Sequence, residues 1–311
     1  MSSYLAALMD IYWLRPETAA WRACDCLALE DVEFVAPIAD VGCGDGLFSF
    51  TRAGGRIDRS YDMFSQVERL GDFFSNVDIF NHFDETAATP QVTVAPRYTI
   101  DVGVDHKQSL LDKAAALGFY TRTMTADANV SLPLEDGKYN TIYSNILYWL
   151  EDYGAALREM RRSLNDSGKV VLQVPNDTFK DYSFYQRLFV RTGDERWKWL
   201  SLIDRGRSEN IKQCKSYSAW SAIFAEAGFK VSHHKLYLSK PLLEAWDIGL
   251  RPLSPFLIEM ANGLSKEKRL DIKKRWVEAL LPLVAPFCEI RTPFDETHPP
   301  GFHLFVLEKR A

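Results

Sequence analysis

An acid followed by three alternating glycines is the feature of this sequence that most clearly suggests ligand chemistry. In the segment 37–50, an apolar run ends at Asp40, glycines occupy positions 42, 44 and 46, and an apolar helical pattern begins at Leu47. Glycine adopts backbone conformations that other residues avoid. It also lets a ligand lie against the main chain, close to the amides that open the next helix. The segment therefore predicts a strand, a tight turn and a helix, which is where doubly wound sheets bind cofactors.

The spacing of the glycines narrows the choice of cofactor. A dinucleotide site of the form G-x-G-x-x-G would need a glycine at position 47, where the chain has Leu47. The observed D-x-G-x-G-x-G pattern resembles motif I of the class I S-adenosylmethionine-dependent methyltransferases, which have a Rossmann-like fold. A purely steric turn is the alternative, since strand-to-helix corners often use glycine. The resemblance implies S-adenosylmethionine as the cofactor, with S-adenosylhomocysteine as product, and a cofactor-binding role for Asp40, Gly42, Cys43, Gly44 and Gly46.

Polar residues at the ends of later predicted strands complete the expected cofactor site. Asp105 ends the predicted strand 98–105, where a carboxylate can accept both ribose hydroxyls. Asp127 follows the strand 119–126, and the block after it resembles the family pattern D-A-x-x-L-P, whose acid accepts the adenine amino group. The strand 139–144 leads into residues that would line the methionine part. The resemblance therefore adds Asp105, His106, Asp127, Ala128, Asn145 and Tyr148 to the cofactor-binding set. For His106, a place in the cofactor wall and a plain helix-start role both stay open.

Two later blocks extend the resemblance. The segment 168–172 is similar to the family's hairpin into the fifth strand, and the segment 225–229 is similar to its step into the sixth. The resemblance thus covers about 35–175, 217–238 and the last strand. Asn140 departs from the pattern, because the family usually has an aspartate there. The segment 16–22 and the run 105–107 resemble, more loosely, a bacterial subfamily associated with sugar or cell-envelope modification.

Helices and strands alternate along most of the chain, which predicts an α/β fold with a parallel sheet. We expect a doubly wound, mostly parallel seven-stranded sheet with an antiparallel last strand. An N-terminal helical cap over 1–34 should precede the methyltransferase domain of 35–311. The second strand of such a unit should follow the glycine turn by about 20 residues, yet here it begins near Tyr98. We therefore expect insertions at about 54–97, 177–216 and 241–298, the last forming a helical lid.

The amino-acid composition limits which partners the protein can bind and in which compartment it can function. The net charge of −5 over 311 residues argues against a general nucleic-acid binder, which would need cationic contacts to phosphate. Neither a secretory signal nor an apolar run of about 18 residues is visible. Five scattered cysteines indicate reduced thiols and no zinc or other metal site. We expect a cytoplasmic protein without a transmembrane segment. The charged run 266–274 predicts a solvated helix face, with weak contact to an anionic membrane as the alternative.

The catalytic base is not identified by the sequence. Methyl transfer from a sulfonium needs in-line positioning and, for a hydroxyl or amine acceptor, a base. We expect a small-molecule or glycan-type acceptor, with carbon acceptors left open. Two other functions compete: a module that binds S-adenosylmethionine without transfer, and a nicotinamide-dependent oxidoreductase, which Leu47 and Asp127 disfavour. Groups near the expected sulfonium are Tyr12, Arg15, Tyr148, Asp177, Asp181 and Tyr182, and Arg15, Arg97 and Arg187 are candidates to hold an acidic group of the acceptor.

Overall fold

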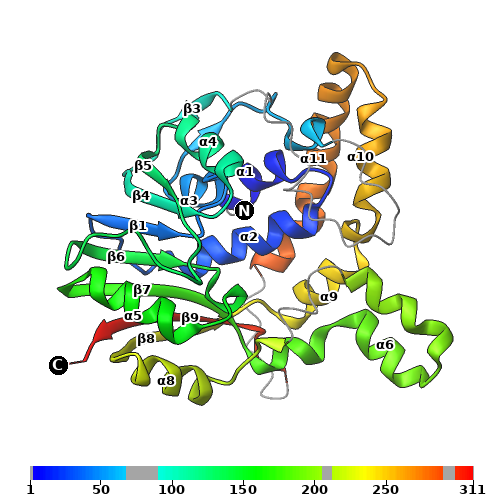
Figure 1. Cartoon of the computed structure of the whole chain (residues 1–311). Helices are drawn as coiled ribbons and strands as arrows, with labels where there is room; N and C mark the ends of the chain where they lie inside the picture. Colours follow the sequence, from blue (N-terminus) through cyan, green and yellow to red (C-terminus); the bar gives the residue numbers. More distant parts are fainter. Residues whose placement is uncertain (1–2, 68–89, 205–211, 290–297, 311) are drawn as a thin grey trace.

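A seven-stranded sheet organises the chain, as Figure 1 shows. The structure is a computed structural model that describes residues 3–67, 90–204, 212–289 and 298–310. The strand order across the sheet is β5-β4-β1-β6-β7-β9-β8. The strands are β1 (Ile38–Val41), β4 (Ile100–Asp105), β5 (Tyr120–Thr125), β6 (Tyr139–Ser144), β7 (Leu164–Pro175), β8 (Phe229–Tyr237) and β9 (Phe302–Lys309).

The pairing confirms the predicted sheet. β1 pairs in parallel with β4 on one side and with β6 on the other, and β9 runs antiparallel to β7 and β8. All four residues of β1 are buried, as expected for a central parallel strand covered on both faces. The strand order reverses on either side of β1. Its carboxyl end is therefore the switch point at which such sheets bind ligands.

Helices cover both faces of the sheet and bury two apolar cores. One core contains Phe50, Phe119 and Tyr143, together with the N-terminal helices. The other contains Leu157 and Trp220. The covering helices are α3 (Leu47–Arg52), α4 (Gln108–Ala116), α5 (Tyr153–Ser163) and α8 (Tyr217–Glu226). The two cores hold the sheet rigid behind its carboxyl edge.

The N-terminal region, predicted to be helical, forms two helices. α1 spans Ser3–Ile11 and α2 spans Pro16–Ala28. Pro16 occupies the first turn of α2, where its missing amide hydrogen costs no hydrogen bond. In Figure 1, α2 lies beside the carboxyl ends of β1 and β6. We propose, in keeping with the predicted cap over 1–34, that these helices cover one side of the cofactor edge.

The first expected insertion begins with short elements. β2 (Arg56–Ile57) pairs antiparallel with β3 (Val92–Val94), and the 3-10 helix η1 (Met63–Gln66) lies between them. Residues 68–89 of this expected insertion lie outside the described residues. Arg97 donates from Nε to the carbonyl of Ala53 at 3.2 Å. Its guanidinium therefore helps to fix the chain after α3. This structural role explains the presence of Arg97 without any contact to the methyl acceptor.

The segment 177–204, within the second expected insertion, forms two 3-10 helices and one α-helix. These are η4 (Asp177–Tyr182), α6 (Phe184–Thr192) and η5 (Glu195–Asp204). The Tyr182 hydroxyl donates to the carbonyl of Pro299 at 2.7 Å, and Arg187 pairs with Glu244 at 2.5 Å. Both side chains thus have structural partners.

The third expected insertion consists mainly of helices in its described part. It contains α9 (Lys240–Ile248), the 3-10 helix η6 (Arg251–Leu253), α10 (Ser254–Asn262) and α11 (Lys266–Glu289). No helix in the described segments has the length and apolarity needed to cross a membrane. The limits of the three insertions remain part of our proposal for the domain organisation.

The charged run at the start of α11 is exposed at Lys266, Glu267, Lys268, Asp271 and Lys274, as predicted, but two of its basic residues are buried. Arg269 and Lys273 are 7% and 2% exposed. The Arg269 guanidinium pairs with Asp62 at 2.8 Å, and the Lys273 ammonium donates to the carbonyl of Arg59 at 2.9 Å. Their helical spacing of four residues places both on one face of α11. That face packs on the segment 58–62, so these two positive charges are paired or hydrogen-bonded inside the protein.

Candidate cofactor site

The glycine turn follows β1 and has a left-handed backbone. The φ angles are +84° at Gly42, +56° at Gly44 and +76° at Gly46. A Cβ atom at Gly42 would lie 2.5 Å from the side chain of Ile146, whereas a Cβ at Gly44 would have no protein atom within 4 Å. The turn is therefore closed against the protein at Gly42 and open at Gly44, which leaves room for a ligand against the main chain.

The Asp105 carboxylate ties β4 to this turn. Its Oδ2 atom accepts a hydrogen bond from the Gly44 amide at 3.0 Å, and its Oδ1 atom accepts one from the Lys107 amide at 3.0 Å. The side chain is only 9% exposed. Each carboxylate oxygen can accept more than one hydrogen bond, so Asp105 is oriented by the protein and keeps capacity for further donors.

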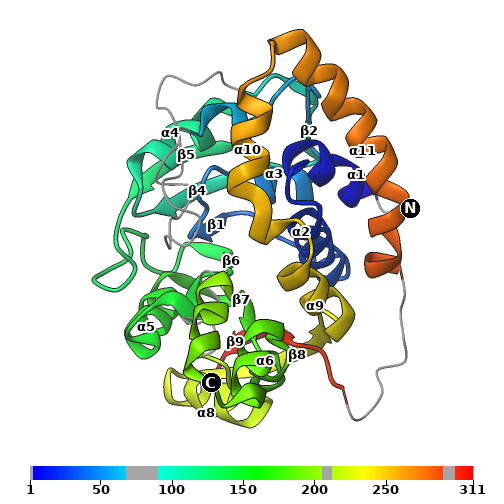
Figure 2. The same ribbon diagram turned by 90° about the vertical axis from the view of Figure 1, so that its right-hand side faces the viewer.

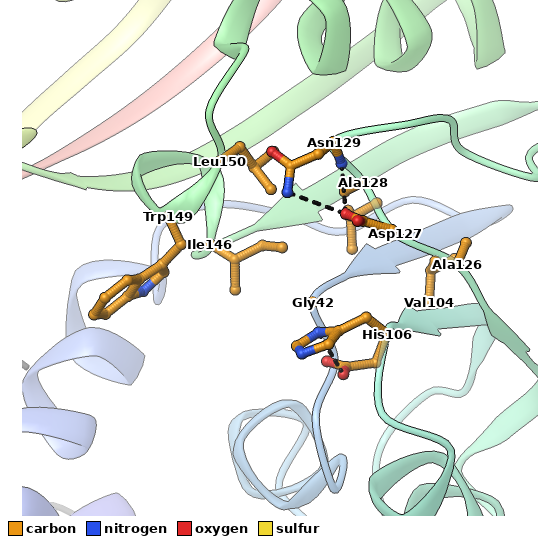
Figure 3. Close-up of a pocket in the computed structure, with 12 residues that line it drawn as sticks. Gly42, Val104, His106, Ala126, Asp127, Ala128, Asn129, Ile146, Trp149 and Leu150 are labelled. Carbon is orange, nitrogen blue, oxygen red and sulfur yellow. Dashed lines mark hydrogen bonds and ion pairs between the residues drawn. The ribbon is translucent and has the colours of Figure 1, made fainter. Parts of the chain in front are cut away.

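A cavity of about 360 Å³ opens beside this carboxylate. Figure 3 shows its lining, which comes from the ends of β1 and β4 and from the segments after β5 and β6. The lining residues are Val41, Gly42, Val104, Asp105, His106, Ala126, Asp127, Ala128, Asn129, Ile146, Trp149 and Leu150. The structure thus brings together five of the residues predicted from the sequence: Gly42, Asp105, His106, Asp127 and Ala128.

The His106 ring lies on the wall of this cavity. Its Nδ1 atom is 3.4 Å from Oδ1 of Asp105, and the side chain is 65% exposed. Figure 3 shows the His106 ring beside Gly42. His106 therefore lines the cavity, and its role in the cofactor wall stays a prediction.

Asp127 and Asn129 form the polar end of the cavity, shown in Figure 3. Oδ1 of Asp127 accepts hydrogen bonds from the backbone amide of Asn129 at 2.9 Å and from its side-chain amide at 3.1 Å. The Asn129 side-chain oxygen accepts from the Glu151 amide at 2.7 Å. Asn129 therefore connects the segment after β5 with the segment after β6 at the cavity.

Seven lining residues lie outside the predicted cofactor-binding set: Val41, Val104, Ala126, Asn129, Ile146, Trp149 and Leu150. Asn129 stands two positions after Asp127, and Ile146, Trp149 and Leu150 flank the predicted Asn145 and Tyr148. The last three form an apolar wall opposite His106 and Asp127. The signal in the sequence that could have identified them is their position next to predicted residues.

Asp40 lies beneath the turn and outside the cavity lining. It is 1% exposed, and its Oδ2 atom accepts hydrogen bonds from the Ser49 hydroxyl at 2.6 Å and the Tyr120 hydroxyl at 2.8 Å. Burial raises the pKa of Asp40 to about 6, against the opposing effect of these two hydrogen bonds. Cys43 is also buried, at 9% exposure. Three predicted residues of the turn, Cys43, Gly44 and Gly46, do not line the cavity.

We expect Asp40→Asn to flatten the pH dependence of stability between about pH 4 and pH 6. The folded-state pKa is raised to about 6, so this carboxyl favours folding most below its unfolded pKa of about 3.9 and loses that contribution as the pH rises through 6. The loss should amount to about 3 kcal/mol. Urea unfolding from pH 4 to pH 8 measures it. Asp112→Asn, at an exposed position, is the control, and an unchanged slope in Asp40→Asn would contradict the expectation.

Beyond the cavity, a second polar group lies near the carboxyl edge. Arg22 on α2 lies 5.5 Å from the ring of Phe48 and donates to Oδ2 of Asp25 at 3.3 Å. Burial raises the pKa of Asp25 to about 6 and the pKa values of Tyr12 and Tyr148 to about 12. Arg22 and Asp25 were not predicted. Asn145 is half-buried and, like Tyr148, is not part of the cavity lining.

A model of a family described as a methyltransferase domain matches residues 35–234, more than half of the chain. The chain belongs to this methyltransferase family. Membership confirms the expected class, a methyltransferase that uses S-adenosylmethionine on a Rossmann-like fold. The narrower resemblance to a sugar or cell-envelope subfamily remains a prediction. No curated protein matches the sequence.

Two solved structures illustrate what this methyltransferase is similar to at low identity. One is a SAM-dependent methyltransferase from Thiobacillus denitrificans in complex with S-adenosyl-L-homocysteine, with 14% identity, a TM-score of 0.47, and coverage of 100% of this chain and 99% of that one. Another is the [4+2]-cyclase SpnF, with 12% identity, a TM-score of 0.48, and coverage of 95% and 82%. These similarities concern the fold alone.

The residues of the cavity fit S-adenosylmethionine. The volume of about 360 Å³ falls within the range of roughly 300–1,000 Å³ that small-molecule sites occupy. Asp105 supplies an oriented acceptor at the end of β4. The main chain of Gly42 lines the cavity, and the neighbouring Gly44 has no protein atom within 4 Å of a Cβ position.

Proposed function

We propose that this methyltransferase transfers a methyl group from S-adenosylmethionine to a hydroxyl or amine of a small-molecule or glycan-type acceptor in the cytoplasm. The observation that carries the proposal is the meeting of the open glycine turn with the Asp105 carboxylate at the wall of one cavity. This meeting occurs at the switch point of the sheet, where doubly wound folds bind their cofactors.

The lining residues suggest how the cofactor is held. Asp105 would accept the two ribose hydroxyls, and Asp127 would accept the adenine amino group at the far end of the cavity. The apolar wall of Ile146, Trp149 and Leu150 would contact the adenine ring. His106 would cover the ribose edge from the solvent side. The main chain at Gly42 and Gly44 would lie against the methionine part.

The remaining predicted residues either support the glycine turn or border the methionine part of the cofactor in this proposal. Asp40 holds Ser49 and Tyr120 by hydrogen bonds, and the sulfur of Cys43 lies under the turn, 3.7 Å from the carbonyl of Gly44. Because Asp40 is buried, we propose that it orients the turn without touching the cofactor. Asn145 and Tyr148 would border the methionine part from the end of β6.

When bound, S-adenosylmethionine supplies an electrophilic methyl group. The chain's own residues then have to orient the acceptor and exclude water. Tyr12 and Tyr148 have pKa values near 12, so their hydroxyls are protonated at neutral pH and act as hydrogen-bond donors. Arg22 is the cation beside them, since its charge interacts with both tyrosines. We propose that Arg22 binds an anionic group at this edge, either of the cofactor or of the acceptor.

We propose the chemical class of the methyl acceptor from the charge of the chain and the side chains near the carboxyl edge of the sheet. The net charge of −5 provides little electrostatic attraction for a polyanion such as a nucleic acid. Aromatic side chains are frequent near the opening: Trp149 is 46% exposed, and its ring centroid lies 5.2 Å from that of Tyr148. Aromatic faces of this kind suit small molecules and sugars, since they supply a large apolar contact surface.

Calorimetric titration followed by a transfer assay tests the proposal. S-adenosylmethionine and S-adenosylhomocysteine should bind the wild type with micromolar dissociation constants, whereas NAD should not bind. Formation of S-adenosylhomocysteine is then measured over a panel of hydroxyl, amine and glycan acceptors. A lack of binding by both sulfur compounds would overturn the proposal. Binding without transfer to any member of a broad panel would favour the alternative of a binding module.

A further inference from the structure

Two cysteines meet where α2 packs against α11. Figure 2 shows α2 beside the C-terminal end of α11. Cys24 lies in the second half of α2, and Cys288 is the residue before the last one of α11. Neither takes part in the cofactor cavity. The two positions lie near opposite ends of the chain, so only the packing of the two helices brings them together.

Each thiol forms a hydrogen bond with the backbone of the other helix. The Cys24 thiol donates to the carbonyl of Phe287, with 3.9 Å between sulfur and oxygen. The Cys288 thiol donates to the carbonyl of Ala20 at 3.6 Å. Ala20 lies one helical turn before Cys24, and Phe287 directly precedes Cys288. Each sulfur therefore lies against the backbone beside the other cysteine.

The two thiol groups also interact with each other. A hydrogen bond with Cys288 is the largest of the effects that raise the pKa of the Cys24 thiol well above its usual range, and burial is the second. A disulfide forms without movement of the backbone only where two cysteine side chains approach each other from facing positions. Cys24 and Cys288 have this arrangement, and both are free thiols in the structure.

The position of Cys288 gives a small reagent access to the pair. Cys24 and Cys288 are both half-buried, whereas Cys26 and Cys43 are buried. The ends of helices open locally at a lower cost in free energy than their middles, and Cys288 lies at such an end. Because the pKa of Cys24 is raised, little of its thiol is ionised at neutral pH. The first reaction with an oxidant therefore occurs at Cys288.

We propose that Cys24 and Cys288 form a reversible disulfide that locks α11 onto α2, with a small-molecule disulfide of the glutathione type as oxidant. The Cys288 thiolate attacks one sulfur of the oxidant, which forms a mixed disulfide and releases one thiol. The Cys24 sulfur then attacks the Cys288 sulfur, the mixed disulfide breaks, and a second thiol leaves. The protons of both cysteines pass to the two released thiols. Two protein thiols are thus oxidised and one small disulfide is reduced.

The cross-link fixes the second end of α11. Arg269 and Lys273 already hold the first half of this helix on the segment 58–62, and the disulfide holds its C-terminal end on α2. A cross-link that closes a long loop of chain restricts the unfolded state more than one that closes a short loop. The oxidised protein is therefore more stable than the reduced one. In a reducing compartment such a disulfide is transient and responds to the redox state.

Incubation of the full chain with oxidised glutathione at pH 8 tests the proposal. After denaturation in N-ethylmaleimide, three cysteines should carry the label in place of the five of the reduced chain. Peptide mass spectrometry should find Cys24 and Cys288 cross-linked, with the loss of two hydrogens. The Tm should rise by about 5 °C or more, and dithiothreitol should reverse these changes. Five labelled cysteines, a cross-link that omits either residue, or a lasting glutathione adduct on either would overturn the proposal.

Serine variants assign the rise in Tm to this pair. Cys24→Ser and Cys288→Ser should each abolish both the cross-link and the rise in Tm on oxidation. Cys214→Ser, which removes another half-buried cysteine, is the matched control and should keep both. A rise in Tm that persists in Cys288→Ser, or that is lost in Cys214→Ser, would contradict the assignment. None of these measurements uses a cofactor or an acceptor, so their outcome is independent of the proposed function.

Discussion

Asp105→Ala should weaken binding of S-adenosylhomocysteine by about a hundredfold or more. In our proposal the carboxylate accepts two ribose hydroxyls, and a hydrogen bond to a charged group contributes about 1.5–3 kcal/mol. The variant also removes the acceptor that holds the Gly44 amide at 3.0 Å, which adds disorder to the turn. Calorimetric titration of wild type and variant measures the difference.

Two controls separate this effect from a general loss of structure. Asp105→Asn keeps one side-chain oxygen, so it should hold the turn and lose only part of the affinity. Asp112→Ala changes an exposed acid on α4, whose carboxylate accepts a hydrogen bond from Gln108 at 2.7 Å, and should leave binding unchanged. Wild-type affinity in a folded Asp105→Ala would rule out the ribose role.

Alanine substitutions at Gly42 and Gly44 should have different effects on the stability of the fold. Gly42→Ala is expected to destabilise the fold by about 3 kcal/mol or more, because it combines a left-handed backbone, which costs about 1–2 kcal/mol, with overlap. The added Cβ would lie 2.5 Å from Ile146. Gly44→Ala has a φ of +56° and no neighbour within 4 Å, so it should cost only about 1 kcal/mol.

The affinity for S-adenosylhomocysteine should change independently of the stability. Gly44→Ala places a methyl group where we propose that the cofactor approaches the main chain, and S-adenosylhomocysteine binding should fall about tenfold or more despite near-normal stability. Chemical unfolding and calorimetry on both variants measure the two effects. A Gly44→Ala variant with unchanged affinity would mean that the open space above the turn is not used by the cofactor.

Much of the cofactor edge could be predicted because its determinants are local. Alternating strands and helices predict the parallel sheet, and the D-x-G-x-G-x-G spacing predicts the turn after β1. In a parallel sheet the carboxyl ends of neighbouring strands meet at one edge. Residues that follow these ends, such as Asp105 and Asp127, are therefore near one another in any fold of this order, and the structure places both on one cavity.

The burial of individual polar groups could not be predicted in the same way. Asp40 belongs to the glycine motif, yet it lies beneath the turn because Ser49 and Tyr120 close over it. Arg269 and Lys273 lie in a charged run, yet α11 packs that face on the chain before η1. Whether a charge in such a motif or run is solvated depends on which elements pack against it.

Backbone preference and strand order are sufficient to predict the fold class, the position of the turn and the acids at the strand ends. Which side chains form the cavity walls and which are buried depends on how distant parts of the chain pack. The Glu17 carboxyl group and the Leu250 amide are 233 positions apart in the chain. Their contact exists because α2 and the segment after α9 are packed together, and no local pattern in the sequence records such packing.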